Sequence, residues 1–363
     1  MTSITISAQS KNNRVLSVDF LRGLTMFLLV SRFGQLFDPS SSKPIVALLG
    51  RQLEHAYWDG LTAWDLVQPV FMFIAGVSMP LSIVPKWNKG VSWKRTFYGV
   101  LQRSLILLLL GWLIGSTASR SSFTNVLAQL SVTYFISFLL MRFAIRWQLL
   151  VSLLLIIITD VIYRTFGVPG FDQPFTADHN FGSWFDIFLT GGLSEDRWVA
   201  FNAVPTAAHT IWGVATGLVL MKDWTQKKKT LVLFFAGIAG IIAGYSLGMY
   251  IPMIKRTCTS SFIFASGGWA VAILAVCYYV MDVIKLKRWV LPFAIVGMNP
   301  LFIYLFWHSG GARVMESLAE PVVYRLFAWS GQMAVNAVMV LVVAFMMWYI
   351  CYFMYRRNIF IRI

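Results

Sequence analysis

Charged side chains are scarce in this chain of 363 residues. Asp, Glu, Lys and Arg make up only 12% of it, whereas soluble domains usually carry about 25%. Hydrophobic residues make up 58%. So few charges leave little water-facing surface, which excludes an ordinary soluble domain and favours an integral membrane protein.

Cysteine and the common catalytic motifs are also lacking. The three cysteines, Cys258, Cys277 and Cys351, form no CxxC pair. This excludes a disulfide framework and a zinc site, and we expect no bound metal. The chain has no P-loop, GxSxG or HExxH motif, and no feature suggests a nucleic-acid partner.

A cleavable signal peptide is not expected. The first fifteen residues are mostly polar, and the first apolar segment is interrupted by Asp19, Arg22 and Arg32. The hydrophobic region of a signal peptide does not carry such charges. We therefore expect the N-terminus to stay in the cytoplasm.

Long apolar segments dominate what is present. A helix needs roughly 20 mostly apolar residues to cross a bilayer. The segments that meet this need lie near 16–36, 64–84, 99–117, 125–143, 147–165, 205–222, 229–249, 260–281, 289–308 and 332–354. These runs are too long and uniform for a membrane β-barrel. The sequence therefore predicts an all-α polytopic bundle of about ten transmembrane helices, forming one domain over residues 1–363.

The net charge of +15 is concentrated in alternate loops. Lys and Arg gather in 85–98, 142–146, 222–229, 282–288 and the tail after 355. The positive-inside rule then places both termini in the cytoplasm and the long loop 166–204 in the periplasm. We expect a multi-pass protein of the bacterial inner membrane, with anionic lipids or cofactors as further partners of the basic residues. The segment 309–331 is too polar to span and is expected along the outer surface.

The densest cluster of polar and aromatic residues is 54–69, at the outer entrance to the second predicted helix. His55 can gain or lose a proton near neutral pH. Asp59, four residues later, could orient the imidazole if this stretch is helical. Asp65 and Gln68 enter the membrane, where a carboxylate is costly unless it is paired or faces water. A catalytic site is favoured over the alternative, an aromatic belt with a capping Asp.

Charges also enter the membrane near its cytoplasmic side. Asp19 and Arg22 can pair on one helix face, and Gly23 lets another helix come close. Arg103 lies one turn inside the boundary, where it could bind a phosphate or a carboxylate. The alternative for Asp19 and Arg22 is simple snorkelling toward the surface.

Further polar residues mark other helix ends. The four histidines, His55, His179, His209 and His308, all fall on the outer side and could ring a shared cavity. The alternative is interfacial histidines that contact headgroups. Ser260 lies where the eighth predicted helix enters the membrane, in the segment 255–261 of basic and small polar residues. Asn299 precedes Pro300, which frees a backbone carbonyl inside a span or merely kinks the helix.

Several of these motifs together resemble a known family. The residues are those of 17–25, 55–62, 64–66, 69–76, 126–130, 133–135, 259–262 and 297–300. They are similar to the heparan-α-glucosaminide N-acetyltransferase family, and most closely to its uncharacterised bacterial members, over nearly the full length. The motif at the second helix is specific, and the later ones are individually weak. The family usually has Asn where this chain has Asp59.

The resemblance implies a transmembrane acyltransferase. It would take acetyl-CoA at the cytoplasmic side and pass the acetyl group to a periplasmic sugar or glycan, on an amine or hydroxyl. The essential histidine of the family corresponds to His55, acting as base or as acyl carrier. Asp59 and Asp65 complete the expected catalytic set.

The basic cytoplasmic face suits the polyanionic coenzyme A, whose pantetheine arm would rise through a continuous cavity to His55. The expected cofactor-binding residues are Arg22 with its partner Asp19, Arg103, Gln68 and Asn299. Those expected to bind the acceptor are Trp58, His209, His308 and Ser260.

A transporter or flippase for a sugar or lipid-linked intermediate is the alternative function. Such proteins often contain inverted repeats and broken helices around a midplane site. No repeat is evident in this sequence, which favours the acyltransferase. The sequence is compatible with a homodimer and does not decide the oligomeric state.

Overall fold

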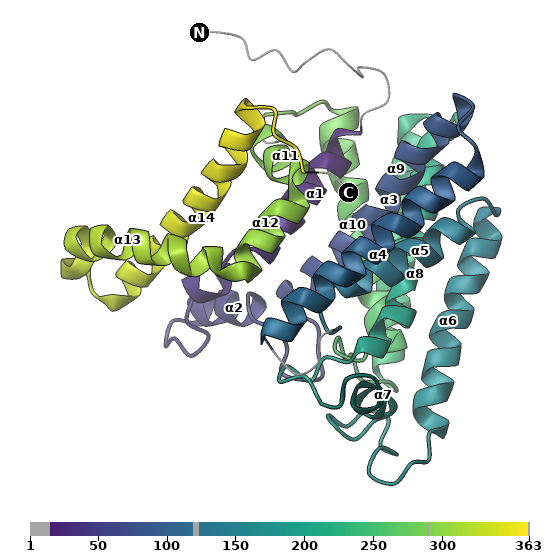
Figure 1. The fold of residues 1–363 in the computed structure, drawn as a ribbon, viewed down its shortest axis with the longest axis horizontal. Helices are drawn as coiled ribbons and strands as arrows, with labels where there is room; N and C mark the ends of the chain where they lie inside the picture. Colours follow the sequence, from purple (N-terminus) through teal and green to yellow (C-terminus); the bar gives the residue numbers. More distant parts are fainter. Residues whose placement is uncertain (1–14, 119–122, 289, 362–363) are drawn as a thin grey trace.

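The computed structural model describes residues 15–118, 123–288 and 290–361. Within these ranges all regular structure is helical and no strand occurs. These ranges hold fourteen α-helices, with short 3-10 or π-helical segments between some of them (Figure 1). The all-α fold expected from the long apolar runs is confirmed.

Among the described residues, seven helices are long and apolar enough to cross a membrane. They are α3 (Val67–Asn88), α4 (Trp93–Ala118), α6 (Ile145–Thr165), α8 (Ala203–Met221), α9 (Gln226–Gly248), α10 (Ser260–Tyr278) and α14 (Gln332–Arg356). An eighth span would combine α11 (Val290–Met298) with the helical stretch that begins with α12 (Pro300–Phe306), across a bend of 73°. The chain is a multi-pass membrane protein.

Two of the ten expected spans form shorter helices. α1 (Leu16–Leu29) has 14 residues and α5 (Val126–Leu140) has 15, against the roughly 20 that a span needs. α1 stops before Ser31 and Arg32, and a 3-10 turn (Phe33–Leu36) follows. The count of about ten and the cytoplasmic termini therefore remain predictions.

The outer face of α6 shows where the lipid lies. Between Gln148 and Ile162 its exposed residues are all aliphatic: Leu149, Leu150, Leu153, Leu154, Ile157, Ile158 and Val161. Facing water, this row would be a larger apolar patch than soluble proteins tolerate. Facing the hydrocarbon of the bilayer, the same row makes no unfavourable contact with water, and the helix satisfies its own backbone hydrogen bonds.

Helices α3, α8 and α10 form the centre of the bundle. Most of each is buried, whereas little of α4, α6 and α9 is buried. Small residues allow the central contacts. A Cβ atom on Gly76 of α3 would lie 2.1 Å from the Thr210 carbonyl oxygen of α8, and one on Gly213 would lie 2.1 Å from the Phe73 oxygen. Close backbone approach is the usual means of packing membrane helices.

The first helix is held at two places. The Asp282 carboxylate accepts hydrogen bonds from the Leu16 and Ser17 amides, at 2.8 and 3.0 Å, and so satisfies the start of α1. A Cβ atom on Gly23 would lie 1.8 Å from the Phe293 oxygen. The prediction that Gly23 admits a neighbouring helix is therefore confirmed, and the neighbour is α11.

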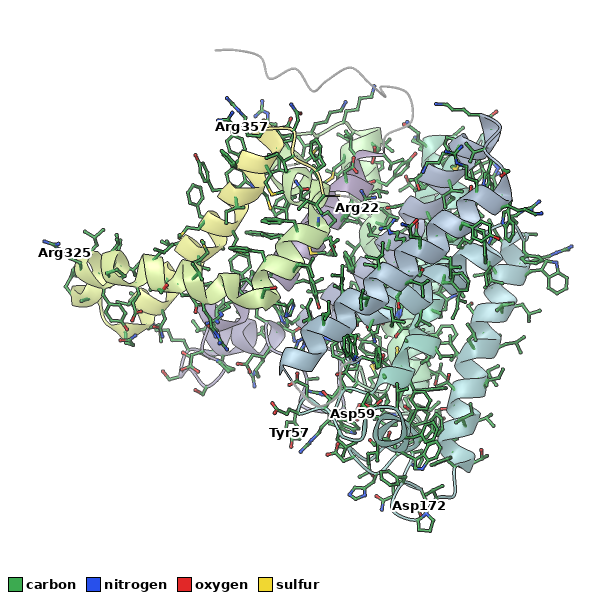
Figure 2. The ribbon with its side chains drawn as sticks, viewed as in Figure 1. Arg22, Tyr57, Asp59, Asp172, Arg325 and Arg357 are labelled. Atoms are coloured by element: carbon green, nitrogen blue, oxygen red, sulfur yellow. The ribbon has the colours of Figure 1, made fainter. Side chains whose placement is uncertain are left out.

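The two ends of the bundle differ. Arg22 and Arg357 lie toward one end and Tyr57, Asp59 and Asp172 toward the other (Figure 2). The long loop 166–204 contains a short helix, α7 (Phe181–Thr190), and packs against the residues that follow α2 (Pro44–Gln52). The polar segment 309–331 forms α13 (Ala312–Phe327), at the side of the bundle in Figure 1.

Candidate active site

His55 and Asp65 form the centre of the site. The His55 Nδ1 atom lies 2.8 Å from Asp65 Oδ1. The chain between them is a loop that ends in a 3-10 turn (Trp64–Leu66) leading into α3. Asp65 is 1% exposed, whereas the His55 side chain is 49% exposed. A buried carboxylate therefore orients an imidazole that a reactant can approach.

The loop wraps around the Asp65 carboxylate. Its Oδ2 atom accepts hydrogen bonds from the Ala56 amide at 3.1 Å, the Thr62 amide at 3.2 Å and the Thr62 hydroxyl at 3.0 Å. A buried charge needs such partners because it has left water. These bonds place Ala56, and with it His55, relative to α3.

Lys255 completes this group, which we call the His55 cluster (His55, Asp65 and Lys255). Its Nζ atom lies 3.3 Å from Asp65 Oδ1 and 3.1 Å from His55 Nδ1. Burial lowers the pKa of Lys255, and the Asp65 charge opposes that shift. Ionised Asp65 can only accept, so Lys255 donates to it and we assign the His55 ring proton to Nδ1, where it is also donated to Asp65. Nε2 then keeps its lone pair.

Arg256 ties the surrounding loops together. Its guanidinium donates to the carbonyls of Ala56 and Tyr57, at 3.0 and 2.7 Å, and to that of Asp196 at 2.6 Å. The Trp58 indole donates to the Phe175 carbonyl at 2.7 Å. Trp58, which we expected to bind the acyl acceptor, thus holds the long loop against the segment around His55.

Asp59 lies elsewhere than expected. The stretch that follows His55 is not helical, so the spacing of four residues does not bring Asp59 to the ring. Its Oδ1 atom instead accepts from the Met253 amide at 2.7 Å. Asp59 fixes the loop that carries Lys255, and Asp65 is the carboxylate that orients His55.

A cavity of about 350 Å³ lies among α1, α3, α4, α5 and α12. We call it the arginine cavity because Arg22 and Arg103 both line it, as do Ser78 and Tyr134. Arg22 donates to the Ser78 hydroxyl and lies 3.6 Å from Asp19. The structure therefore brings together three of the five residues expected to bind the cofactor.

Arg103 holds an unused donor in this cavity. Its guanidinium carbon lies 4.6 Å from the Tyr134 ring centre, and its NH1 group is 3.3 Å from the Tyr134 hydroxyl. Its Nε atom is buried and has no hydrogen-bond partner in the described part of the chain. A buried, unpaired donor is costly, and an anionic ligand in the cavity would satisfy it.

Gln68 and Asn299 have other partners. Gln68 donates to Gln129 at 2.7 Å, and Gln129 donates to Asn202. At the break between α11 and α12, Asn299 donates to the Ile359 carbonyl and accepts from the Ile361 amide, both at 2.9 Å. Asn299 therefore anchors the chain that follows α14.

The arginine cavity does not reach His55. Its lining on α3 is Phe71, Ala75, Ser78, Met79 and Ser82. Gln68 and Asp65 continue the same side of the helix outward, and the buried Gln68–Gln129 pair lies between the cavity and the His55 cluster. The continuous cavity expected from the sequence is therefore not present in this conformation. From Ser78 to Asp65 the helix rises about 20 Å.

The other three residues that we expected to bind the acyl acceptor lie in separate environments. His209 is fully buried, with Nε2 at 2.9 Å from the Ser266 hydroxyl of α10. The His308 ring lies 4.3 Å from that of Tyr304. Ser260 is buried, and its hydroxyl has no partner. They form no ring of histidines around His55. Among the described residues, no group of His, Cys, Asp and Glu is arranged to hold a metal ion.

Lys255 was the residue that sequence reasoning missed. It stands 190 positions after Asp65, in a loop before α10, where a lysine reads as an ordinary interfacial charge. The one available signal was the buried carboxylate itself, because Asp65 entering the membrane requires a cationic partner.

Two curated proteins are similar to the chain over nearly its whole length. The heparan-alpha-glucosaminide N-acetyltransferase of Homo sapiens is 26% identical, over 96% of this chain and 60% of the relative. That of Mus musculus is 24% identical, over 98% and 61%. The chain thus spans about three fifths of the length of these relatives. No family model matches the chain. Across almost its full length, then, the chain is related at the family level to heparan-alpha-glucosaminide N-acetyltransferase.

Proposed function

We propose that the chain is a transmembrane acyltransferase that moves an acetyl group from acetyl-CoA to an amine or hydroxyl of a sugar. The observation that carries the proposal is the His55 cluster, where a buried carboxylate holds Nδ1 and leaves Nε2 for a reactant. The related N-acetyltransferases support the reaction class.

The imidazole can serve in either of two roles. As a general base, Nε2 takes the proton of the acceptor nucleophile and returns it to the leaving thiolate. As an acyl carrier, Nε2 itself attacks the thioester carbonyl, and the C–S bond breaks to release the CoA thiolate. The acceptor then attacks the acetyl-imidazole, its proton passes to the thiolate or to solvent, and Nε2 is regenerated. In both roles Asp65 stabilises the imidazolium, and Lys255 keeps Asp65 ionised.

The arginine cavity fits the acyl donor. Acetyl-CoA supplies an activated thioester on a polyanionic carrier. Arg22 and the unpaired Nε of Arg103 offer donors for anionic or carbonyl oxygens. The volume of about 350 Å³ suits part of the carrier. The buried Gln68–Gln129 pair must move for the thioester to approach His55.

The test is acetyl-CoA binding to the detergent-purified chain by calorimetry, together with thioester hydrolysis and transfer to glucosamine. We expect His55→Ala to bind acetyl-CoA like the wild type and to lose turnover. Arg103→Gln should weaken binding by about tenfold, the value of one charge-assisted hydrogen bond.

His179→Ala is the matched control, because that histidine is exposed in the long loop and contacts Gly170. It should retain both binding and turnover. If neither the wild type nor any variant binds acetyl-CoA at millimolar concentration, the acyltransferase proposal fails. The alternative, a transporter or flippase for a sugar or lipid-linked intermediate, would then lead.

A further inference from the structure

A second cavity opens at the lysine-rich end of the bundle. It has a volume of about 450 Å³ and lies among the start of α1, the ends of α3, α8 and α10, and the start of α9. This volume is within the range of small-ligand sites. It shares no lining residue with the arginine cavity. We call it the lysine cavity, after Lys229, Lys285 and Lys287 in its lining.

The charge of this lining is positive. Among the described residues that line it, the three lysines contribute +3 and the single carboxylate, Asp282, contributes −1, which leaves +2. Both Asp282 oxygens already accept amide hydrogens at the start of α1. Lys229 donates to the Leu220 carbonyl at 2.8 Å, which uses one of its three N–H groups.

Lys285 and Lys287 are exposed and are not committed to a carboxylate. Within residues 15–118, 123–288 and 290–361, neither of them takes part in an ion pair. The backbone brings them to the cavity by a turn after α10, in which the amides of Ile284 and Leu286 bond back to Tyr279 and Val280. Lys285 closes this turn in the left-handed region, at a φ of 68°.

The deeper wall of the cavity is apolar. Leu220, Tyr278 and Met281, which line it, are buried, whereas the lysines Lys285 and Lys287 are exposed. Cations at the rim and hydrocarbon below suit an amphiphile with an anionic headgroup. Basic pockets between transmembrane helices at the cytoplasmic surface bind phosphate-bearing lipid headgroups in this way.

We propose that the lysine cavity binds the phosphate headgroup of an anionic membrane lipid. Lys229, Lys285 and Lys287 hold the phosphate oxygens, and the apolar wall receives the first part of the acyl chains. Since Asp282 joins this cavity to the first turn of α1, a bound lipid stabilises the α1–α10 contact. This role is independent of acyl transfer.

The experiment compares two double variants that remove the same charge. Lys285→Gln/Lys287→Gln alters the cavity, whereas Lys227→Gln/Lys228→Gln alters the neighbouring first turn of α9, where Lys228 lies over Trp224. The melting temperature of the full chain in neutral detergent is measured with added phosphatidylglycerol or with phosphatidylcholine of the same acyl chains. Native mass spectrometry counts the bound lipids.

We expect phosphatidylglycerol to raise the melting temperature of the wild type and of K227Q/K228Q alike, while K285Q/K287Q loses most of that rise and one bound lipid. Equal loss in both variants would mean diffuse charge attraction and would overturn the site. An equal rise with inorganic phosphate alone would overturn the lipid as the source. If K285Q/K287Q does not fold, the two single variants replace it and should each lose part of the rise.

Acetyl-CoA binding serves as an independent reading in the same samples. Because the two cavities share no lining residue, K285Q/K287Q should keep the acetyl-CoA affinity of the wild type. Loss of acetyl-CoA binding together with lipid binding would assign the lysine cavity to the nucleotide and overturn the lipid proposal.

Discussion

At the scale of single residues, the chemistry depends on charges that have left water. Asp65 is almost fully buried, and its ionised state depends on Lys255, His55 and the surrounding amide and hydroxyl groups. Breaking a buried ion pair by removing one partner leaves the other charge uncompensated, at a cost of about 3–5 kcal/mol. The pair therefore matters for folding as well as for catalysis.

This cost makes a prediction for Asp65 and Lys255. Asp65→Asn and Lys255→Met should each destabilise the chain by about 3 kcal/mol, because each leaves one buried charge alone. The double variant should lose clearly less than the sum, since no charge then remains. Unfolding of the purified variants in denaturant measures the coupling, and strict additivity would show that the two side chains do not interact.

Asp186 in α7 makes stability depend on pH. Burial raises the pKa of this carboxyl to about 7 from its ordinary value of 3.8, although a bond from the Ala200 amide partly opposes the shift. Between these two values the folded chain keeps a proton that the unfolded chain has lost. Stability should therefore fall as pH rises from about 4 to about 7, by at most about 1.4 kcal/mol per pH unit.

Asp186→Asn tests this prediction, because the amide cannot ionise and its oxygen can still accept from Ala200. The melting temperature of the variant, relative to that of the wild type, should be higher at pH 8 than at pH 5. Asp172→Asn, an exposed carboxyl of the same loop, should show no such difference. Parallel pH profiles for Asp186→Asn and the wild type would contradict the shifted pKa.

At the scale of helices, close packing replaces the hydrophobic effect. Lipid is as apolar as a leucine side chain, so helices associate where their backbones can approach. α3 and α8 meet at Gly76 and Gly213, and α1 meets α11 at Gly23. These contacts hold α3, and with it Asp65, in place.

Gly76→Ala should consequently destabilise the bundle by on the order of 1–3 kcal/mol, because its Cβ would lie 2.1 Å from the Thr210 oxygen. Gly99→Ala in α4 is the matched control, since a Cβ there meets nothing within 4 Å. That control should be neutral or slightly stabilising, as alanine favours helix over glycine. Equal melting temperatures for the two variants would contradict the close α3–α8 contact.

At the scale of the whole molecule, the charges of the loops predict the orientation. Lys227, in the first turn of α9, and Asp172, in the long loop, lie in segments that the positive-inside rule assigns to opposite sides. Lys227→Cys and Asp172→Cys should therefore react with an impermeant maleimide from opposite sides of the membrane in intact cells and inverted vesicles. The native cysteines Cys258 and Cys351 are buried, and a variant lacking Cys277 removes the remaining background. Reaction of both sites from one side would refute the topology.

Much of the architecture could be predicted from the sequence. The apolar runs predicted helices at all ten places, because a chain in lipid must satisfy its own backbone. The resemblance singled out His55, and the cost of a carboxylate in the membrane singled out Asp65. The sequence could not predict the lengths of α1 and α5 or the sharp break at Asn299, because neighbouring helices decide where a short apolar helix stops.

What the sequence determined by itself is the class of the molecule, a multi-pass helical membrane protein related to an acetyltransferase family. These properties depend on composition and on local motifs. Only the tertiary structure decided which polar groups meet: Lys255 rather than Asp59 joins His55 and Asp65, Gln68 pairs with Gln129, and Asn299 holds the chain after α14. The reason is physical, because the burial that makes each of these pairs necessary exists only once distant helices have packed together.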